Sequence, residues 1–357
     1  MFYPAVLRYA GYMNEDESTM STDNEGILRK TGDLPNWYEM DEVSLLPLPF
    51  RLYASWVKYG LKRKNGYSLG GSFIFSLIRM WYRRFPLAGD NFVSLPWQGN
   101  RFLITLDLLD FEVINHTLPL LSGASSESKL VQMLMPERGV FFDVGANHGV
   151  FSLLAASQGG DEAVVHAFEP QPRLAHAIEL SKKLNHFSSL NIHNIALGAK
   201  EESKTLYLPR ESSGVASLIE LHVKSTDTVA HEITVKVDLL DTVVEEMGIG
   251  RMDLIKIDVE GFELDVFQGG EKSLKKLQPF IWFEMSPAGQ ETAGHGQSEI
   301  YHLLEQFGYH DFYDIRGIAC GYPVKAGVVN SLTNVLAVPV SRQEQLHAAL
   351  ETIRSQG

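Results

Sequence analysis

One stretch, residues 140–156, limits the fold of this chain more than any other. It begins with an apolar run, continues through an acid and two glycines, and passes into a second apolar segment. That order is typical of a buried parallel strand, a tight turn and a helix. Gly145 and Gly149 lack a Cβ atom, so the backbone can bend sharply there and a ligand can lie against it. The helix would point free N–H groups at that ligand, which predicts a nucleotide-type site.

The glycine spacing argues against a dinucleotide. In G-x-G-x-x-G the second glycine admits a pyrophosphate, but this chain has Asn147 there and a G-x-x-x-G spacing. This disfavours a nicotinamide-dependent oxidoreductase, and Asp143 would repel a diphosphate. A plain turn without a ligand is disfavoured by the strand and the acid beside it. A cationic, phosphate-free ligand fits better, and S-adenosylmethionine (SAM) carries a sulfonium, an ammonium and a ribose.

Three motifs follow one another along the chain: Asp-Val-Gly-Ala-Asn-His-Gly at 143–149, Phe-Glu-Pro at 168–170 and Ile-Lys-Ile-Asp-Val-Glu-Gly-Phe-Glu at 255–263. Together, and in this order, they resemble the FkbM family of SAM-dependent methyltransferases. The resemblance covers about residues 125–340, and the third motif is the most specific. It implies a Rossmann-like class I methyltransferase fold of the α/β class, with a seven-stranded, mostly parallel sheet whose last strand is antiparallel.

Strand and helix patterns alternate from Gly139 onward, which is typical of a parallel sheet with helices on both faces. Strands are expected at residues 163–168, 190–194, 233–237, 252–258, 280–284, 309–313 and 335–338. Helices are expected at residues 172–187, 239–247, 263–277 and 298–307. The polar, Ser-rich stretch 210–231 between them is expected to form a mobile loop over the site.

The chain is predicted to have three parts. Residues 1–47 form a mobile acidic arm, residues 48–125 a helical and hairpin N-terminal region, and residues 126–357 the SAM-dependent methyltransferase domain. Two strands, at 91–95 and 101–106, are expected to form a hairpin, and a short helix is expected at 127–134.

Charge is spread unevenly along the chain. The net charge is −13, yet residues 51–84 contain eight Lys and Arg and no acid. Aromatic residues lie among these basic ones in residues 48–86, so the segment could contact an anionic membrane peripherally. Two amphipathic helices packed on the catalytic domain or on a second subunit of a homo-oligomer are favoured, because such helices are common in soluble proteins. The overall acidity argues against a nucleic-acid partner.

Cellular location is predicted from cysteine use and hydropathy. Cys320 is the single cysteine of the chain, which points to a reducing, cytoplasmic compartment. No signal sequence is evident at residues 1–4, and the apolar stretch 67–82 is too short and interrupted to span a bilayer.

Three acids, Asp143, Glu169 and Asp258, each end a predicted strand, so they should converge beyond the carboxyl ends of the sheet. Glu169 can accept two hydrogen bonds from vicinal ribose hydroxyls, and it can also cap the helix that follows Pro170. Asp143 would either favour the ligand's ammonium or organise the glycine turn.

The family resemblance implies that Asp143, Gly145, Asn147 and Gly149 line the cofactor. Adenine is expected near Ala196 and Leu197, with Asn194 where many SAM enzymes have an acid. His148 is expected to face solvent at the start of the helix, and a role as general base is the less favoured alternative.

Asp258 and Glu260 are two residues apart and would face the same side of an extended segment, where Glu284 could join them. They are predicted to contact SAM or the acceptor, with either one as the catalytic base. A divalent cation on these three carboxylates is the alternative, disfavoured because no His or Asn completes an octahedron. Glu263 and Asp265 are predicted to stabilise the next helix.

These observations predict a SAM-dependent methyltransferase. The hydroxyl of a sugar or secondary metabolite as acceptor is implied by the family resemblance alone. A non-catalytic or membrane-associated binding module on the same fold is the alternative, because of residues 48–86.

Overall fold

The computed structural model describes residues 92–96, 102–107, 110, 112–113, 117, 125–209, 212–220, 223–224, 229–328 and 331–356. The predictions for the acidic arm and for the basic aromatic segment 48–86 lie outside these residues. The chain divides into two compact units, one of Met1–Leu109 with Ile114–Gly123 and one of Asp110–Val113 with Ala124–Gly357. No helix in the described part of the chain is both long and apolar enough to cross a membrane.

In the first unit, two strands pair as predicted. β1 (Phe92–Pro96) runs antiparallel to β2 (Leu103–Asp107), with Phe92 opposite Asp107. The expected hairpin strands are therefore confirmed to within two residues.

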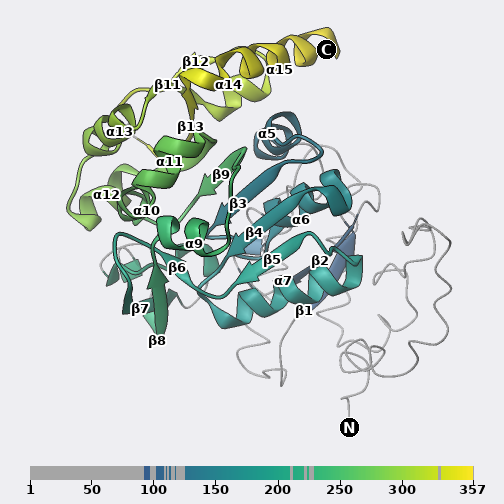
Figure 1. Ribbon diagram of the computed structural model, residues 1–357. Coiled ribbons are helices and arrows are strands. Elements are labelled where there is room, and N and C mark those ends of the chain that lie inside the picture. The colour runs from purple at the N-terminus through teal and green to yellow at the C-terminus, as the bar shows by residue number, and fades with distance from the viewer. Residues whose placement is uncertain are drawn as a thin grey trace, which may run out of the picture. The chain divides into compact units, whose positions relative to one another are not determined.

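The second unit is built on one twisted sheet with the strand order β12-β11-β13-β10-β9-β3-β4-β5 (Figure 1). Its strands are β3 (Val140–Val144), β4 (Val164–Phe168), β5 (Leu190–His193), β9 (Leu254–Ile257), β10 (Phe280–Met285), β11 (Tyr309–Asp314), β12 (Val324–Lys325) and β13 (Thr333–Pro339). Strands β5, β4, β3, β9 and β10 are parallel neighbours, and β13 runs antiparallel to both β10 and β11. The predicted fold class is confirmed, with the two-residue β12 as an eighth strand at the edge.

Helices cover both faces of this sheet, with α10, α11 and α13 on one side of β3 and β9 and α6 on the other (Figure 1). The helices are α5 (Ser126–Leu134), α6 (Val150–Gly159), α7 (Pro172–Asn185), α9 (Leu240–Glu246), α10 (Glu263–Gly269), α11 (Glu271–Leu277), α12 (Pro287–Ala293), α13 (Gln297–Gln306), α14 (Ile315–Ala319) and α15 (Gln343–Gln356). Alternate strand residues explain the two faces. Val144 and Ile257 join the core under α10 and α13, whereas Trp282 packs edge-on against Phe151 of α6 at 4.7 Å between ring centroids.

A second, smaller sheet is the main element that the sequence did not predict. It joins β6 (Ala196–Leu197), β7 (Glu202–Pro209) and β8 (Val229–Asp238) in the order β6-β8-β7. No strand was expected at β7, which is half-exposed at most positions and lacks a regular apolar alternation. Its buried Leu206 packs with Val235 and Phe262 into a core of its own.

The single helix predicted for residues 263–277 is wrong, because it is interrupted between α10 and α11. A Cβ atom on Gly269 would lie 1.9 Å from the carbonyl oxygen of Gly198, so the helix and this turn touch backbone to backbone. The contact demands glycine, and the Gly269-Gly270 pair ends the first helix there.

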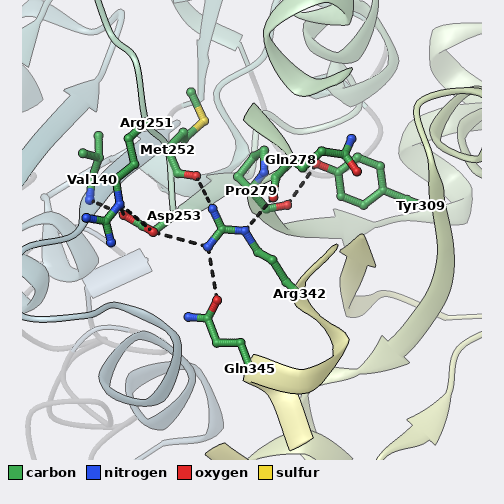
Figure 2. A network of polar contacts seen from close by, with 9 residues as sticks. All are labelled: Val140, Arg251, Met252, Asp253, Gln278, Pro279, Tyr309, Arg342 and Gln345. Carbon is green, nitrogen blue, oxygen red and sulfur yellow. Dashed lines mark hydrogen bonds and ion pairs between the residues drawn. The ribbon is translucent and has the colours of Figure 1, made fainter. Parts of the chain in front are cut away.

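Arg342 holds together the amino ends of three central strands, at the edge away from the glycine turn (Figure 2). Its guanidinium donates to the carbonyl oxygens of Gln278 at 2.6 Å and Met252 at 2.9 Å, which precede β10 and β9. It also donates at 3.3 Å to Asp253, whose buried carboxylate accepts from the N–H of Val140 at the start of β3 at 2.9 Å. One side chain thus satisfies buried acceptors from neighbouring strands.

We expect Arg342→Ala to lower the free energy of unfolding by about 2–3 kcal/mol, since it leaves buried carbonyls and a carboxylate short of a donor. Arg138→Ala is the matched control, because its ion pair with Glu162 is exposed (75% and 59% of the side-chain surfaces) and should contribute at most about 1 kcal/mol. Urea unfolding measures both. Equal losses would contradict the strand-clamping role.

Candidate functional site

The turn after β3 has the sharp bend that its glycines predicted. Gly145 and Gly149 have φ angles of +77° and +76°, and Asn147 between them has a φ of +52°. The space beside the glycines is used by the protein itself, because a Cβ on Gly145 would lie 1.9 Å from the carbonyl oxygen of Asp258. A Cβ on Gly149 would lie 2.9 Å from the side chain of Ile178. The glycines therefore allow close packing of the strand ends as well as the bend.

A hollow of about 560 Å³, partly open to solvent, lies at the carboxyl ends of β3, β4 and β9. The glycine turn, the ends of β4 and β9, the β5–β6 segment, β7 and residues 213–218 line it. Among the described lining residues the ionisable side chains are all acidic, namely Glu169, Asp258 and Glu260. The hollow is thus suited to a ligand with positive charge and hydroxyl groups, and poorly suited to a phosphate.

Glu169 follows β4 and lies buried in the wall of the hollow. Its two carboxylate oxygens accept from the backbone N–H groups of Asn147 and Gln171, each at 2.8 Å. Burial raises the pKa of Glu169 to about 7, although these N–H groups oppose the shift. The two roles predicted for Glu169, binding ribose hydroxyls and capping the next helix, are compatible, because each oxygen keeps a lone pair for a ligand hydroxyl.

Asp143 is close to the hollow but does not line it. It is fully buried within β3, and its Oδ2 accepts from the N–H of Ser152 at 3.0 Å and from its hydroxyl at 2.6 Å. The carboxylate thereby satisfies an N–H group in the first turn of α6. Of the two roles predicted for Asp143, the structure supports organisation of the turn.

The prediction that His148 faces solvent is wrong. Only 1% of its surface is exposed, and its Nδ1 lies 2.5 Å from the side-chain oxygen of Asn147. That oxygen also accepts from the hydroxyl of Ser213 at 3.2 Å, which ties the glycine turn to the segment across the hollow. The left-handed backbone at Asn147 turns the next residue inward, which residue type alone does not reveal.

Lys256 is the residue of the site that the sequence analysis missed. It lies in the middle of β9 with a side chain only 5% exposed, directly opposite Asp143 in the strand register. Its ammonium lies 2.8 Å from Oδ2 of Asp258, and Asp258, Asp143 and Glu284 raise its pKa against the opposing effect of burial. A lysine inside an apolar strand was the available signal, because lysine is almost never buried without a partner.

Asp258, Glu260 and Glu284 come together as predicted, but Glu260 does so by a different route. Each offers an oxygen within 4.8 Å of the others. Glu260 has a φ of +53°, so a left-handed turn and not an extended segment brings it beside Asp258. Burial, followed by the charge of Asp258, raises the pKa values of Glu260 and Glu284 well above the usual range.

The remaining predicted residues divide between the wall of the hollow and its support. Ala196 and Leu197 line the hollow as β6, whereas the amide of Asn194 donates to the carbonyl oxygens of Glu169 at 2.8 Å and Pro170 at 3.1 Å. Buried Glu263 accepts from Val259 and Gly261 N–H groups and stabilises the turn, as expected of a structural acid.

Residues 213–218 contribute to the lining of the hollow, and hydrogen bonds hold this segment at Ser213 and Ser217. Buried Asp110 accepts from the N–H of Ser213 at 3.0 Å, and the hydroxyl of Ser217 donates to the carbonyl oxygen of Glu260 at 2.8 Å. This described part of the predicted loop does lie over the site, and Asp110 is a supporting residue that the sequence gave no reason to select.

The fold and the hollow define an open α/β protein with an acid-lined site beyond the carboxyl ends of its parallel strands. Residues 143–310, slightly less than half of the chain, match the family described as the methyltransferase FkbM domain. This part of the chain is thus similar to an FkbM methyltransferase domain.

Curated relatives agree with this assignment at low identity. The chain is 27% identical over 148 residues to Methyltransferase 1 of Beauveria bassiana, 27% over 176 residues to the 2-O-methyltransferase NoeI of Sinorhizobium fredii, and 29% over 157 residues to the 31-O-demethyl-FK506 methyltransferase FkbM of Streptomyces tacrolimicus. These matches cover 38%, 46% and 37% of this chain. They span 59%, 70% and 59% of the relatives, so two of the three are matched over less than two thirds of their length.

Gly145→Ala tests the close approach of the turn to Asp258. Gly248→Ala is its matched control, because Gly248 also has a positive φ (+63°) but a Cβ there would meet nothing within 4 Å. We expect the control to lose about 1–2 kcal/mol of unfolding free energy from backbone strain alone. Gly145→Ala should lose at least about 2 kcal/mol more, since its clash is with backbone. Equal losses in chemical denaturation would contradict the packing role.

Stability should fall as pH rises through about 7. The pKa values of Glu169 and Glu263 are both raised to about 7, so the folded chain holds these protons more tightly than the unfolded chain. The resulting stabilisation is full below the ordinary value of 4.5 and is lost as pH passes the raised value, on the order of 2–3 kcal/mol for each group.

Unfolding free energies at pH 5 and pH 8 measure this dependence. Glu169→Gln should lose less stability between the two pH values than the unmodified chain does, with Glu263 still titrating. Glu162→Gln, at an exposed site, should leave the pH dependence unchanged. An identical pH profile for Glu169→Gln would contradict the raised pKa.

Proposed function

We propose that this chain is a SAM-dependent O-methyltransferase that acts on a hydroxyl of a sugar or secondary metabolite. The observation that carries the proposal is the hollow itself, whose ionisable lining residues are Glu169, Asp258 and Glu260 in the part of the chain that the structure describes. It lies in the part of the chain that is similar to an FkbM methyltransferase domain, at the end of the sheet where open α/β proteins bind ligands.

The residues present fit SAM. Glu169 keeps acceptor capacity for the ribose hydroxyls, and apolar side chains of Ile195, Leu206 and Leu218 offer a surface for adenine near Ala196. Asp258, which lines the hollow, supplies negative charge for the ammonium and sulfonium groups. When bound, SAM supplies a methyl group that its sulfonium already activates.

The protein's own part is to align the acceptor and exclude water, which can lower the barrier by up to about 7–11 kcal/mol in ideal cases. An attacking hydroxyl must lose a proton, and a carboxylate with a raised pKa is a better base near neutral pH than an ordinary one. Glu260 meets this condition and lines the hollow. Asp258, held by Lys256, is the second catalytic candidate.

The choice of oxygen as acceptor is supported by two relatives whose names specify O-methylation, NoeI and FkbM. The membrane-associated binding module rests on residues 48–86, which lie outside the described residues, and it stays a prediction.

Calorimetry with SAM and with its demethylated product tests the proposal. We expect both to bind and a nicotinamide dinucleotide not to bind. Glu169→Ala should weaken SAM binding about 10- to 100-fold, because two charge-assisted hydrogen bonds are lost. Glu179→Ala, on the outer part of α7, is the control and should bind normally. No SAM binding by the unmodified chain, or unchanged affinity in Glu169→Ala, would reject this site.

A further inference from the structure

Three carboxylates form a compact group beside the hollow. Asp258 and Glu260 belong to the turn after β9, Glu284 lies near the end of the neighbouring strand β10, and one oxygen of each lies within 4.8 Å of the others. Oxygens around one hard cation have separations of this order, since the cation lies at about 2.0–2.6 Å from each.

Glu284 provides a second, independent observation. It is 92% buried, since only 8% of its surface is exposed, and its Oε2 has no hydrogen-bond partner. A buried carboxylate oxygen without a donor is costly, and in native proteins such an atom calls for an explanation such as a bound ion. The carboxylate of Glu284 belongs to the three-oxygen group, so a cation there would satisfy it.

Lys256 does not neutralise the whole group of carboxylates. Its ammonium lies 2.8 Å from Oδ2 of Asp258 and carries one positive charge, whereas the group carries up to three negative charges and Asp143 lies behind it. Lys256 can therefore offset at most one of them. A buried surplus of negative charge is unfavourable unless it is paired or coordinates a metal.

We propose that Asp258, Glu260 and Glu284 bind a hard divalent cation of the Mg²⁺ type. The ligand set is entirely oxygen and contains no thiolate or imidazole, which favours Mg²⁺ or Mn²⁺ over Zn²⁺. Asp258 and Glu260 also line the hollow, and Asp258 is one-third exposed, so the cation keeps an open side toward the ligand space.

Because one side of the cation faces the ligand space, the cation can bind a substrate. Mg²⁺ in proteins retains several exchangeable positions, which a substrate oxygen can occupy. This step rests on the proposed function. The cation then holds a hydroxyl of the acceptor, and acceptors with two adjacent oxygens, both of which can bind the cation, should bind best. Cation binding itself needs neither SAM nor acceptor.

Mn²⁺ titration followed by electron paramagnetic resonance, with the full chain and without SAM, tests the site. We expect one bound Mn²⁺ per chain, displaced by excess Mg²⁺. Glu284→Gln and Asp258→Asn should each weaken Mn²⁺ binding about 10-fold or more. Glu291→Gln is the matched control, an exposed acid on α12 that should bind Mn²⁺ normally. Circular dichroism confirms that each variant is folded.

The melting temperature gives a second measure of Mn²⁺ binding, independent of the titration. Mn²⁺ should raise the melting temperature of the unmodified chain and of Glu291→Gln but not that of Glu284→Gln. No Mn²⁺ binding by the unmodified chain, or undiminished binding in the folded Glu284→Gln variant, would overturn the proposal.

Calorimetry with SAM in the presence of EDTA distinguishes failure of the cation proposal from failure of the proposed function. SAM binding without Mn²⁺ binding rejects the cation and leaves the methyltransferase proposal in place. Mn²⁺ binding lost in Glu284→Gln, in a chain that does not bind SAM, supports the cation site and rejects the proposed function.

Discussion

The candidate site depends on one buried positive charge, the ammonium of Lys256. It lies opposite Asp143 in the strand register and 2.8 Å from Asp258, so it links the interior of the sheet to the wall of the hollow. Removing a buried charge from such a group leaves its partners uncompensated, which costs more than the pair contributes. Lys256 therefore offsets one of the negative charges that the acids bring together at the strand ends.

Two acids near the carboxyl ends of neighbouring strands have different roles because one lies within its strand and the other lies just beyond its strand. Asp143 is inside β3 and faces α6, where Ser152 takes up its Oδ2. Glu169 is the first residue after β4 and reaches the hollow while accepting from two backbone N–H groups. A shift of two register positions, from inside one strand to just beyond its neighbour, thus separates an acid that supports the turn from one that is available to a ligand.

The sequence was a good guide where a pattern is local. The order of the main strands and helices, the glycine turn and the proximity of Asp258 to Glu284 follow from periodicity, glycine and the position of acids, whereas Glu260 joins them through a left-handed turn. It was a poor guide to β7, whose partner β8 lies beyond residues 212–220, and to the backbone contact between Gly269 and Gly198. Such features arise between segments far apart in the chain.

The sequence by itself determined the fold class and the location of a site at the carboxyl ends of the strands, because alternating strand and helix patterns with acids after the strands allow few other arrangements. Only the tertiary structure decided which acids face the ligand, that His148 is buried and that Lys256 compensates the acids. The physical reason is that burial and charge pairing are set by neighbours on other strands, whereas periodicity reports only on the segment in which it occurs.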